Sequence, residues 1–378
     1  MTTIHGHCAP DFAPVKAAFE ANFARRDDIG ASVAVSFEGE MVVDLWGGVL
    51  ARGSDEPWRE DTIVNVWSTT KTMAALSLLV LADKGEIAFD APVARYWPEF
   101  GAAGKEDVTL AHVMSHQAGL SGMDALAEGD ALYDWDWMTR SLAAQAPWWK
   151  PGTGSGYHAL TQGYLQGEVV RRVTGQTLGA FFKQEIAEPM DADFQIGVSE
   201  DSRARIAPML VPSETVSLPQ DDSIAARTFR SPKVDAAQCN ERGWQEAQIP
   251  AANGHGNARS VVRAQTAMAN GGEAFGKRIL SEEGASRVME EQCRGVDHVL
   301  HAPSVFGLGY GINSDLMPLA PNKNVCFWGG YGGSLILVDQ DARMCVSYVM
   351  NRMEPGIQGD ERGLSIAMAA YMALAQRG

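Results

Sequence analysis

The chain has 378 residues, 46% of them hydrophobic and 21% charged, which is the composition of a globular protein large enough to divide into two lobes. Its net charge of -16 disfavours binding to a nucleic-acid backbone. No apolar stretch is long enough to span a bilayer, and the N-terminus lacks the basic start and apolar core of a secretory signal. We therefore expect a cytoplasmic protein with no nucleic-acid or membrane partner, and leave its oligomeric state open.

The five cysteines and eight histidines show no disulfide or metal-binding pattern. The cysteines are scattered without paired spacing, which is typical of buried thiols. The histidines include no His-Glu-x-x-His sequence. We expect neither a metal ion nor a cofactor.

The N-terminal third predicts a helix, a β-hairpin and a buried helix, in that order. Residues 12–25 form an amphipathic segment, and the segments 31–37 and 41–46 flank a Glu-Gly-Glu turn, as in a hairpin. The run 72–82 is apolar nearly all round, which indicates a helix buried on every side. Gly85 would end this helix as a C-terminal cap.

Ser68-Thr69-Thr70-Lys71, the only Ser-x-x-Lys in the chain, opens the buried helix. Residues three apart share a helix face, so the Lys71 amine can reach the Ser68 hydroxyl. A serine nucleophile needs a neighbouring base, and a lysine can be that base at neutral pH when burial lowers its pKa. The pattern indicates a nucleophile with its base. The alternative is a lysine whose ammonium group simply reaches water.

The middle of the chain predicts helices at 109–116 and 161–174, the second ended by Gly175. Residues 211–250 are rich in Pro, Ser, Asp and Gln and have little periodicity. We expect them to form a long loop over a cleft between two lobes.

The glycine-rich segment 148–159 contains Tyr157, just before the second of these helices. A tyrosine held between Ser68 and Lys71 could relay the nucleophile's proton to the leaving group. The alternative is an aromatic side chain that only lines a cleft.

The C-terminal part predicts a second hairpin, from 333–338 and 344–350, and a closing helix over 364–376. Strands at both ends of the chain, with helix-rich sequence between them, indicate one antiparallel sheet built from the termini. The expected division is an α/β sandwich lobe of residues 1–89 and 251–378, and an inserted helical lobe of residues 90–250.

The segment 327–334 is a glycine-rich entry into the second hairpin. Glycines there permit close approach of another backbone or a ligand. The backbone N–H groups of Tyr331 and Ser68 could then bind a developing oxyanion. The alternative is a glycine-rich turn in which Trp328 packs.

Together and in this order, the three motifs resemble the serine β-lactamase and penicillin-binding protein superfamily. Within it they look most like the class C β-lactamase-like esterases, the family VIII carboxylesterases. The resemblance covers nearly the whole chain, including residues 108–120, 253–259 and 348–353. It implies an α/β (α+β) fold of the β-lactamase type, with an antiparallel sheet flanked by helices, an inserted, mainly helical lobe, and the site between the lobes.

The resemblance also implies roles for individual residues. Ser68 would be the acylated nucleophile, Lys71 its base and Tyr157 the proton relay. His116 and His255 fall in structural segments of the family, so we expect hydrogen bonds to satisfy them. The Gly-x-Ser-x-Gly motif of α/β-hydrolases is absent from the sequence, which argues against that other class of serine enzyme.

Two departures from the lactamase pattern concern the substrate. Lactamases carry Tyr-x-Asn and Lys-Thr-Gly where this chain has Tyr157-His158-Ala159 and Trp328-Gly329-Gly330. The missing amide, cation and hydroxyl would otherwise hold a β-lactam, so an uncharged ester is favoured. The expected substrate contacts, in an aromatic-lined cleft, are Trp148, Trp149, His158, Trp328, Gly329, Gly330 and Tyr331.

We therefore expect a serine hydrolase that cleaves small, short-chain carboxylic esters through an acyl-enzyme on Ser68. Alternatives within the superfamily are a β-lactamase, a D-aminopeptidase or other amide hydrolase, and an acyltransferase that excludes water. An alternative of a different class is a non-catalytic binding protein that keeps the fold. The intact trio of serine, lysine and tyrosine argues against that last alternative.

Overall fold

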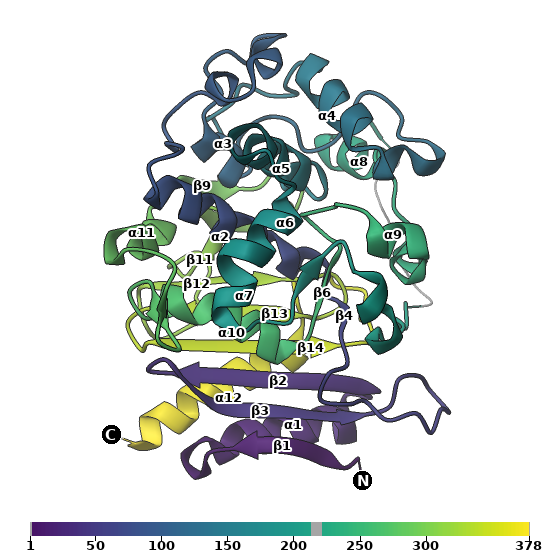
Figure 1. Cartoon of the computed structure of the whole chain (residues 1–378), viewed down its shortest axis with the longest axis vertical. Helices are drawn as coiled ribbons and strands as arrows, with labels where there is room; N and C mark the ends of the chain where they lie inside the picture. Colours follow the sequence, from purple (N-terminus) through teal and green to yellow (C-terminus); the bar gives the residue numbers. More distant parts are fainter. Residues whose placement is uncertain (1, 213–220, 378) are drawn as a thin grey trace.

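The computed structural model describes residues 2–212 and 221–377, and it places a helix-rich part above a large antiparallel sheet (Figure 1). Within these residues the sheet has nine strands in the order β1-β3-β2-β14-β13-β12-β11-β10-β9. Their bounds are β1 Ile4–Cys8, β2 Gly30–Phe37, β3 Glu40–Gly48, β9 Cys293–Val296, β10 Pro303–Phe306, β11 Gly311–Ile312, β12 Val325–Gly329, β13 Leu335–Asp339 and β14 Met344–Met350.

Two smaller sheets complete the strands of the described residues. One has the order β4-β6-β5 and leads into the Ser-x-x-Lys helix, and the other is a two-stranded ribbon of β7 and β8. Their bounds are β4 Val64–Asn65, β5 Gln195–Ile196, β6 Gly254–Gly256, β7 Glu273–Ala274 and β8 Lys277–Arg278.

Two hairpins bring the ends of the chain together in the large sheet. β2 pairs with β3 through Glu38 and Gly39, whose φ angles of 51° and 84° suit a tight hairpin turn. β13 pairs with β14, and β14 pairs with β2, which places Val346 opposite Val35. Both predicted hairpins, and the antiparallel sheet assembled from the two termini, are confirmed.

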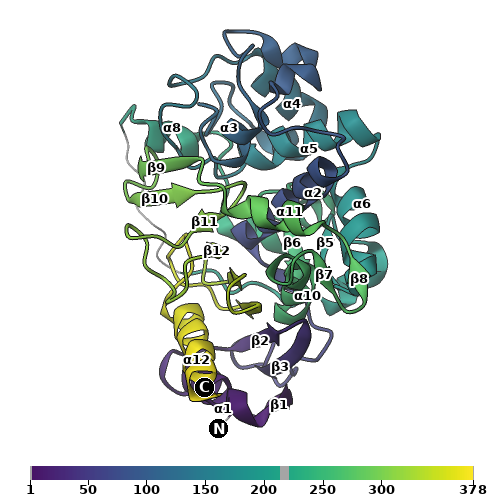
Figure 2. The same cartoon turned by 90° about the vertical axis from the view of Figure 1, so that its left-hand side faces the viewer.

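Helices cover both faces of this sheet (Figures 1 and 2). α1 and α12 pack against each other, and α12 also packs against β14. α10 packs against β2, β13 and β14 from the side of the helix-rich part. The bounds of the α-helices are α1 Ala13–Arg25, α2 Thr70–Asp83, α3 Leu110–Met114, α4 Trp135–Ala144, α5 Thr161–Thr174, α6 Leu178–Phe182, α7 Glu188–Met190, α8 Ile224–Arg230, α9 Arg242–Glu246, α10 Ala258–Ala269, α11 Glu282–Ser286 and α12 Glu361–Arg377.

The α2 helix is buried on every side, as its apolar sequence predicts. Each residue from Thr70 to Leu81 is buried. The chain leaves the helix at Lys84, and Gly85 follows with φ of 74°, the left-handed conformation that glycine adopts after a helix end. α5 also spans the predicted residues and ends at Gly175, whose φ is 75°.

The prediction of a long loop at 211–250 is wrong for part of that segment. It holds α8, a 3-10 helix at Ala236–Asn240 and α9, while residues 213–220 lie outside the described residues. The Ser223 side chain caps α8, and Asp235 forms a capping box with Gln238. Residues that are typical of loops are therefore helix caps here.

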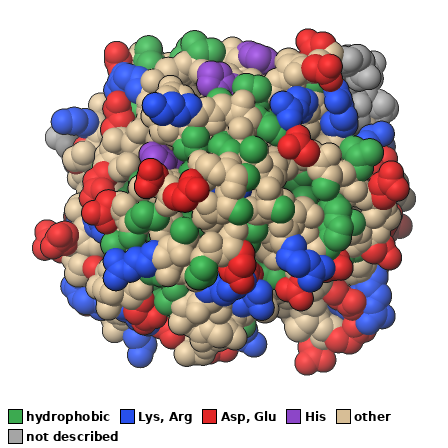
Figure 3. Space-filling model, turned by 90° about the horizontal axis from the view of Figure 1, so that it is seen from above, with side chains coloured by type: hydrophobic (Ala, Val, Ile, Leu, Met, Phe, Trp, Pro, Cys, Tyr) green, Lys and Arg blue, Asp and Glu red, His purple; other side chains and the backbone are tan. Residues whose placement is uncertain are grey.

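The boundaries of the lobes stay a prediction. All nine strands of the large sheet come from residues 4–48 and 293–350, so we keep residues 90–250 as the proposed inserted helical lobe. None of the helices within the described ranges combines the length and apolarity that a bilayer crossing needs. Acidic and basic side chains are interspersed over the face of the helix-rich part (Figure 3).

Candidate active site

Ser68 lies at a sharp corner between strand β4 and helix α2. Trp67, Ser68 and Thr69 form one turn of 3-10 helix, and α2 begins at Thr70. Trp67 has φ of 49°, a left-handed conformation that is uncommon for a large non-glycine residue. Backbone strain of this kind concentrates at functional sites. The corner holds Ser68 only 8% exposed, at the start of the buried helix.

Lys71 lies one turn further along, only 1% exposed, with Nζ 3.2 Å from Ser68 Oγ. The amine also donates to the carbonyl oxygens of Ala159, at 2.7 Å, and Ala251, at 2.9 Å. Burial lowers the pKa of Lys71 well below its ordinary value. A neutral amine has two N–H donors and one lone pair. Because the two carbonyls take both donors, the lone pair is directed at Ser68.

Tyr157 also contacts the serine, with Oη 2.6 Å from Ser68 Oγ. Its ring lies 4.9 Å from Lys71 Nζ, measured to the ring centroid. Burial raises the pKa of Tyr157 above its ordinary value. The side chain is therefore a phenol at neutral pH and can donate a proton. The structure brings all three predicted catalytic residues together.

Two backbone N–H groups near the serine are free to bind an anion. Within residues 2–212 and 221–377, the N–H groups of Ser68 and Tyr331 donate to no protein acceptor. A methyl group at Gly330 would lie 2.4 Å from Val66 O and 3.4 Å from Ser68 N, so the segment that carries Tyr331 runs close beside the serine. The oxyanion hole expected from the Ser68 and Tyr331 N–H groups stays a prediction.

Ser334 and Thr69 fasten these two segments together. Ser334 Oγ donates to the Val66 carbonyl at 2.8 Å, and Thr69 Oγ1 lies 2.8 Å from Ser334 Oγ. All three residues are buried. No sequence pattern indicated a role for Ser334 or Thr69. Both lie inside the quoted motifs, but only the fold shows that they contact each other.

Trp328 packs among the aromatic side chains behind Tyr157. Its ring centroid lies 5.6 Å from that of His116 and 5.8 Å from those of Tyr157 and Phe306. The neighbouring Gly329 has no room for a side chain, because a methyl group there would lie 2.4 Å from the backbone of Gln358. The segment just before α12 thus covers this strand, a contact that no sequence pattern indicated.

His158 was expected to contact substrate, and the structure corrects this. The residue is 0% exposed. Its Nε2 accepts the Leu120 N–H at 3.1 Å, which leaves Nδ1 to donate to Gly156 O at 2.6 Å. Burial lowers the pKa of His158 to about 4. The neutral ring holds the loop and offers nothing to a substrate.

The other two histidines of interest are also buried. His116 Nδ1 accepts the His158 N–H at 3.1 Å, in agreement with a structural role. His255 Nδ1 lies 2.8 Å from Asn253 O, but its Nε2 has no hydrogen-bond partner among the described residues. The expectation that hydrogen bonds satisfy His255 therefore holds for one nitrogen only.

The two neighbouring tryptophans contact other groups in the structure. The Trp148 ring lies 4.0 Å from the Arg227 guanidinium, and its Nε1 donates to Asp124. Trp149 packs against His158 and His298, with centroid distances of 5.9 Å and 5.4 Å. Neither contact reaches the serine, so substrate contact by Trp148 and Trp149 is not supported.

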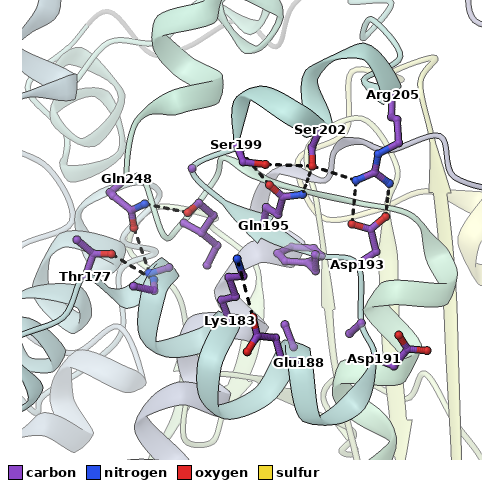
Figure 4. Close-up of a pocket in the computed structure, with 17 residues that line it drawn as sticks. Thr177, Lys183, Glu188, Asp191, Asp193, Gln195, Ser199, Ser202, Arg205 and Gln248 are labelled. Carbon is purple, nitrogen blue, oxygen red and sulfur yellow. Dashed lines mark hydrogen bonds and ion pairs between the residues drawn. The ribbon is translucent and has the colours of Figure 1, made fainter.

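Two cavities differ in their relation to these residues. A cavity of about 170 Å³ is lined by Tyr157, Trp328 and Gly329 together with apolar side chains that include Phe306 and Ile357. A larger one of about 640 Å³ lies beside α6, α7 and β5 and contains none of the candidate catalytic residues (Figure 4). Several of its polar side chains pair with one another, as Arg205 does with Asp193.

No three His, Cys, Asp or Glu side chains gather into a potential metal site in the part of the chain that the structure describes. The contacts among the serine, lysine and tyrosine are those expected of a serine hydrolase. The family model described as Beta-lactamase matches residues 16–370. The chain belongs to the β-lactamase family, as the sequence motifs predicted.

Relatives with esterase names cover nearly the whole chain. Esterase/beta-lactamase LipL of Mycobacterium tuberculosis is 36% identical over 374 residues, which are 95% of this chain and 86% of LipL. Esterase EstB of Burkholderia gladioli is 30% identical over 381 residues, 92% of each chain. A solved structure of a family VIII carboxylesterase superimposes with a TM-score of 0.92 at 42% identity and covers 98% of this chain and 100% of its own. The predicted β-lactamase-like fold is confirmed.

Proposed function

We propose that this protein is a carboxylesterase that hydrolyses small, uncharged esters through an acyl-enzyme on Ser68. The observation that carries the proposal is the position of Ser68 Oγ, 3.2 Å from a buried amine and 2.6 Å from a buried phenol. The two groups have pKa shifts in opposite directions, so one is a base and the other an acid at the same pH. The esterase names of LipL, EstB and the family VIII structure support the choice of esters.

In the first half of the reaction, Ser68 Oγ attacks the ester carbonyl carbon while its proton passes to the Lys71 amine. The carbonyl oxygen becomes an oxyanion, which the N–H groups of Ser68 and Tyr331 bind. The bond from carbon to the leaving oxygen then breaks. Tyr157 gives its proton to the departing alkoxide and regains one from the Lys71 ammonium. The alcohol leaves, and the acyl group stays on Ser68.

Water completes the reaction by a second round of the same proton transfers, with water as the nucleophile and Ser68 Oγ as the leaving oxygen. Its oxygen attacks the acyl carbon while its proton passes to the neutral Lys71 amine, and the oxyanion forms again at the same N–H groups. The bond from carbon to Ser68 Oγ breaks, and the proton returns to the serine through Tyr157. The carboxylic acid leaves, and the site returns to its starting state.

The surroundings of the site favour an uncharged substrate. Position 328 is a tryptophan only 6% exposed and position 329 a glycine against the Gln358 backbone, so neither offers a cation or a hydroxyl. The cavity beside Tyr157 is small and mostly apolar, which suits a short hydrocarbon group. We therefore propose Trp328 and Gly329, with Gly330 and Tyr331 beside them, as the residues closest to the substrate.

Lactam hydrolysis is the second candidate, because the printed name of LipL includes both activities. The same trio of residues could open a β-lactam ring, since acylation of serine is common to both reactions. Positions 328 and 329 lack the cation and hydroxyl that would bind a lactam carboxylate, so lactam hydrolysis is less well supported than ester hydrolysis. An amide hydrolase or acyltransferase has no comparable observation in its favour.

Covalent labelling tests the proposed nucleophile. A serine-reactive phosphonate should add one label per chain, on the peptide that holds Ser68, and the Ser68→Ala variant should take up none. The same two proteins are then assayed with a butyrate ester. A Ser68→Ala variant that keeps the esterase activity would overturn the assignment, and a labelled protein without esterase activity would overturn the choice of substrate.

A further inference from the structure

The carboxylate of Asp297 holds the backbone of Tyr157 from the far end of the large sheet. Asp297 directly follows β9, in the turn that leads to β10, and is 0% exposed. Its Oδ1 accepts the N–H of Tyr157 at 3.0 Å, and those of Val299 and Leu300 at 2.9 Å each. One oxygen thus joins a turn of the sheet to the residue that carries the candidate acid.

The same turn makes a second bond to the loop of Tyr157. The His298 N–H donates to Ser155 O at 2.8 Å. Tyr157 itself is not part of a helix or strand, so its backbone position depends on such long-range bonds. Its hydroxyl must nevertheless stay within 2.6 Å of Ser68 Oγ for proton transfer.

The second oxygen of Asp297 is costly for the fold. Among the described residues Oδ2 is buried and has no hydrogen-bond partner. A buried polar atom without a partner destabilises a protein by roughly 1–3 kcal/mol. A residue that serves stability alone would satisfy both oxygens, as Asp339 at the end of β13 does through Ala342, Asn322 and Tyr371.

We infer that Asp297 is a positioning residue for Tyr157, and the inference rests on the proposed role of Tyr157 as the acid of the esterase reaction. Three N–H bonds to one carboxylate oxygen fix the turn and the loop relative to each other. The bond to the Tyr157 N–H then sets the distance between the phenol and Ser68. Loss of the carboxylate weakens proton donation while the nucleophile and its base stay in place.

Two esters with different leaving groups distinguish a positioning role of Asp297 from a purely structural one. Ethoxide needs a proton to leave, whereas nitrophenolate leaves without one. The Asp297→Ala variant should lower kcat/KM for ethyl butyrate, which reports acylation and not the shared deacylation step, by ~10²-fold, the cost of a misplaced catalytic group. The loss for p-nitrophenyl butyrate should be much smaller. In a Tyr157→Phe background Asp297→Ala should change this kcat/KM by less than about twofold, because both changes disable the same step.

Asp339→Ala is the matched control, since Asp339 is an equally buried aspartate, at the end of strand β13, with no bond to Tyr157. It should lower the Tm but leave both rates within about twofold of wild type. Asp297→Asn serves where Asp297→Ala does not fold. Its neutral amide oxygen accepts hydrogen bonds from the same N–H groups more weakly, so the loss of rate should be smaller than in Asp297→Ala. The loss should still be larger for the ethyl ester than for the nitrophenyl ester.

Three results would overturn the inference: wild-type kinetics for Asp297→Ala, equal losses on the two esters, or an undiminished loss in the Tyr157→Phe background. A wild-type protein that hydrolyses neither ester would instead show that the proposed function is wrong. The rate of phosphonate labelling of Ser68 then becomes the measurement. With a phosphonate whose leaving group is an alkoxide that needs a proton, Asp297→Ala should label more slowly than Asp339→Ala, and equal rates would again overturn the positioning role.

Discussion

Lys71 Nζ lies 3.2 Å from Ser68 Oγ, and it donates hydrogen bonds to the carbonyl oxygens of Ala159 and Ala251. These two carbonyls come from segments 88 and 180 residues away in the sequence. These two hydrogen bonds fix the orientation of the amine, so that its lone pair points at the Ser68 hydroxyl. With burial lowering the pKa of Lys71, the arrangement makes the lysine a base with a defined orientation.

Removal of this amine should abolish acylation. Lys71→Ala should slow phosphonate labelling of Ser68 by ~10²–10⁴-fold, the usual contribution of a general base. Lys105→Ala is a matched control, because Lys105 is also buried and also donates to three backbone carbonyls. It should lower the Tm without slowing the labelling. Equal labelling rates for the two variants would contradict the role of Lys71.

The labelling of wild-type protein should also depend on pH in one direction. Below the lowered pKa of Lys71 the amine carries a proton and has no lone pair for the Ser68 hydroxyl. The second-order rate constant should therefore fall as the pH is lowered through that pKa, about tenfold per pH unit. Labelling at a series of pH values checks this, and a rate that is constant down to the pH of unfolding would contradict it.

Tyr157→Phe removes one oxygen and leaves the packing of the ring intact. The loss of kcat/KM, which reports acylation, should be ~10²–10⁴-fold for an ethyl ester and smaller for a nitrophenyl ester, because only the first leaving group needs a proton. Tyr164→Phe is the control, since Tyr164 is also buried and its hydroxyl donates to Leu132 O in the helix-rich part. If Tyr157→Phe keeps wild-type turnover on both esters, the tyrosine only lines the site.

Two buried histidines should make the fold sensitive to acid. Burial lowers the pKa of His158 and of His255 to about 4, whereas an unfolded chain has histidines near ~6.5. The unfolded state therefore binds more protons between these values. Stability that is present above pH 6.5 is lost as the pH falls toward 4, by roughly 2 kcal/mol per ring between pH 7 and 5.

Urea unfolding of wild type and of His255→Gln at the two pH values checks this prediction. The variant should lose about 2 kcal/mol less than wild type between pH 7 and 5. The comparison uses the change with pH, so any loss of stability at pH 7 does not affect it. An identical change in both proteins would show that His255 does not titrate in this range.

Local sequence patterns correctly predicted the features that are determined by residues close together in the sequence. The alternation of 31–37 and 41–46 predicted a real hairpin, and the spacing of Ser68 and Lys71 predicted a real contact. Both depend on geometry within a few residues. The helix ends at Gly85 and Gly175 follow from the left-handed conformation that glycine adopts easily.

The parts of the site that the sequence missed depend on contacts between distant segments. Asp297 meets Tyr157 across 140 residues, and the Gln358 backbone covers Gly329. His158 is adjacent to Tyr157 in sequence, but its ring bonds to Leu120. Nothing in the periodicity of a loop tells which way each side chain turns, because tertiary hydrogen bonds decide it.

The selectivity of the site should favour esters over β-lactams. A lactam carboxylate needs a cation or hydroxyl, and Trp328 and Gly329 supply neither. kcat/KM for p-nitrophenyl butyrate should therefore exceed that for a chromogenic cephalosporin under the same conditions. Comparable efficiency on the cephalosporin would show that other residues recognise the carboxylate and would favour the lactamase alternative.

The lack of space for a side chain at Gly329 extends this prediction to a double variant. Restoring the lactamase residues, as Trp328→Lys with Gly329→Thr, should not raise the rate on the cephalosporin. The threonine Cβ would lie 2.4 Å from the backbone of Gln358, so the strand or the covering segment must move before the hydroxyl can point at a substrate. Such a shift would also disturb the neighbouring Tyr331 N–H, and ester hydrolysis should fall with it. Trp328→Lys alone is the control, and a gain of lactamase activity in the double variant but not in the single one would show that the segment around Gln358 yields to the new side chain.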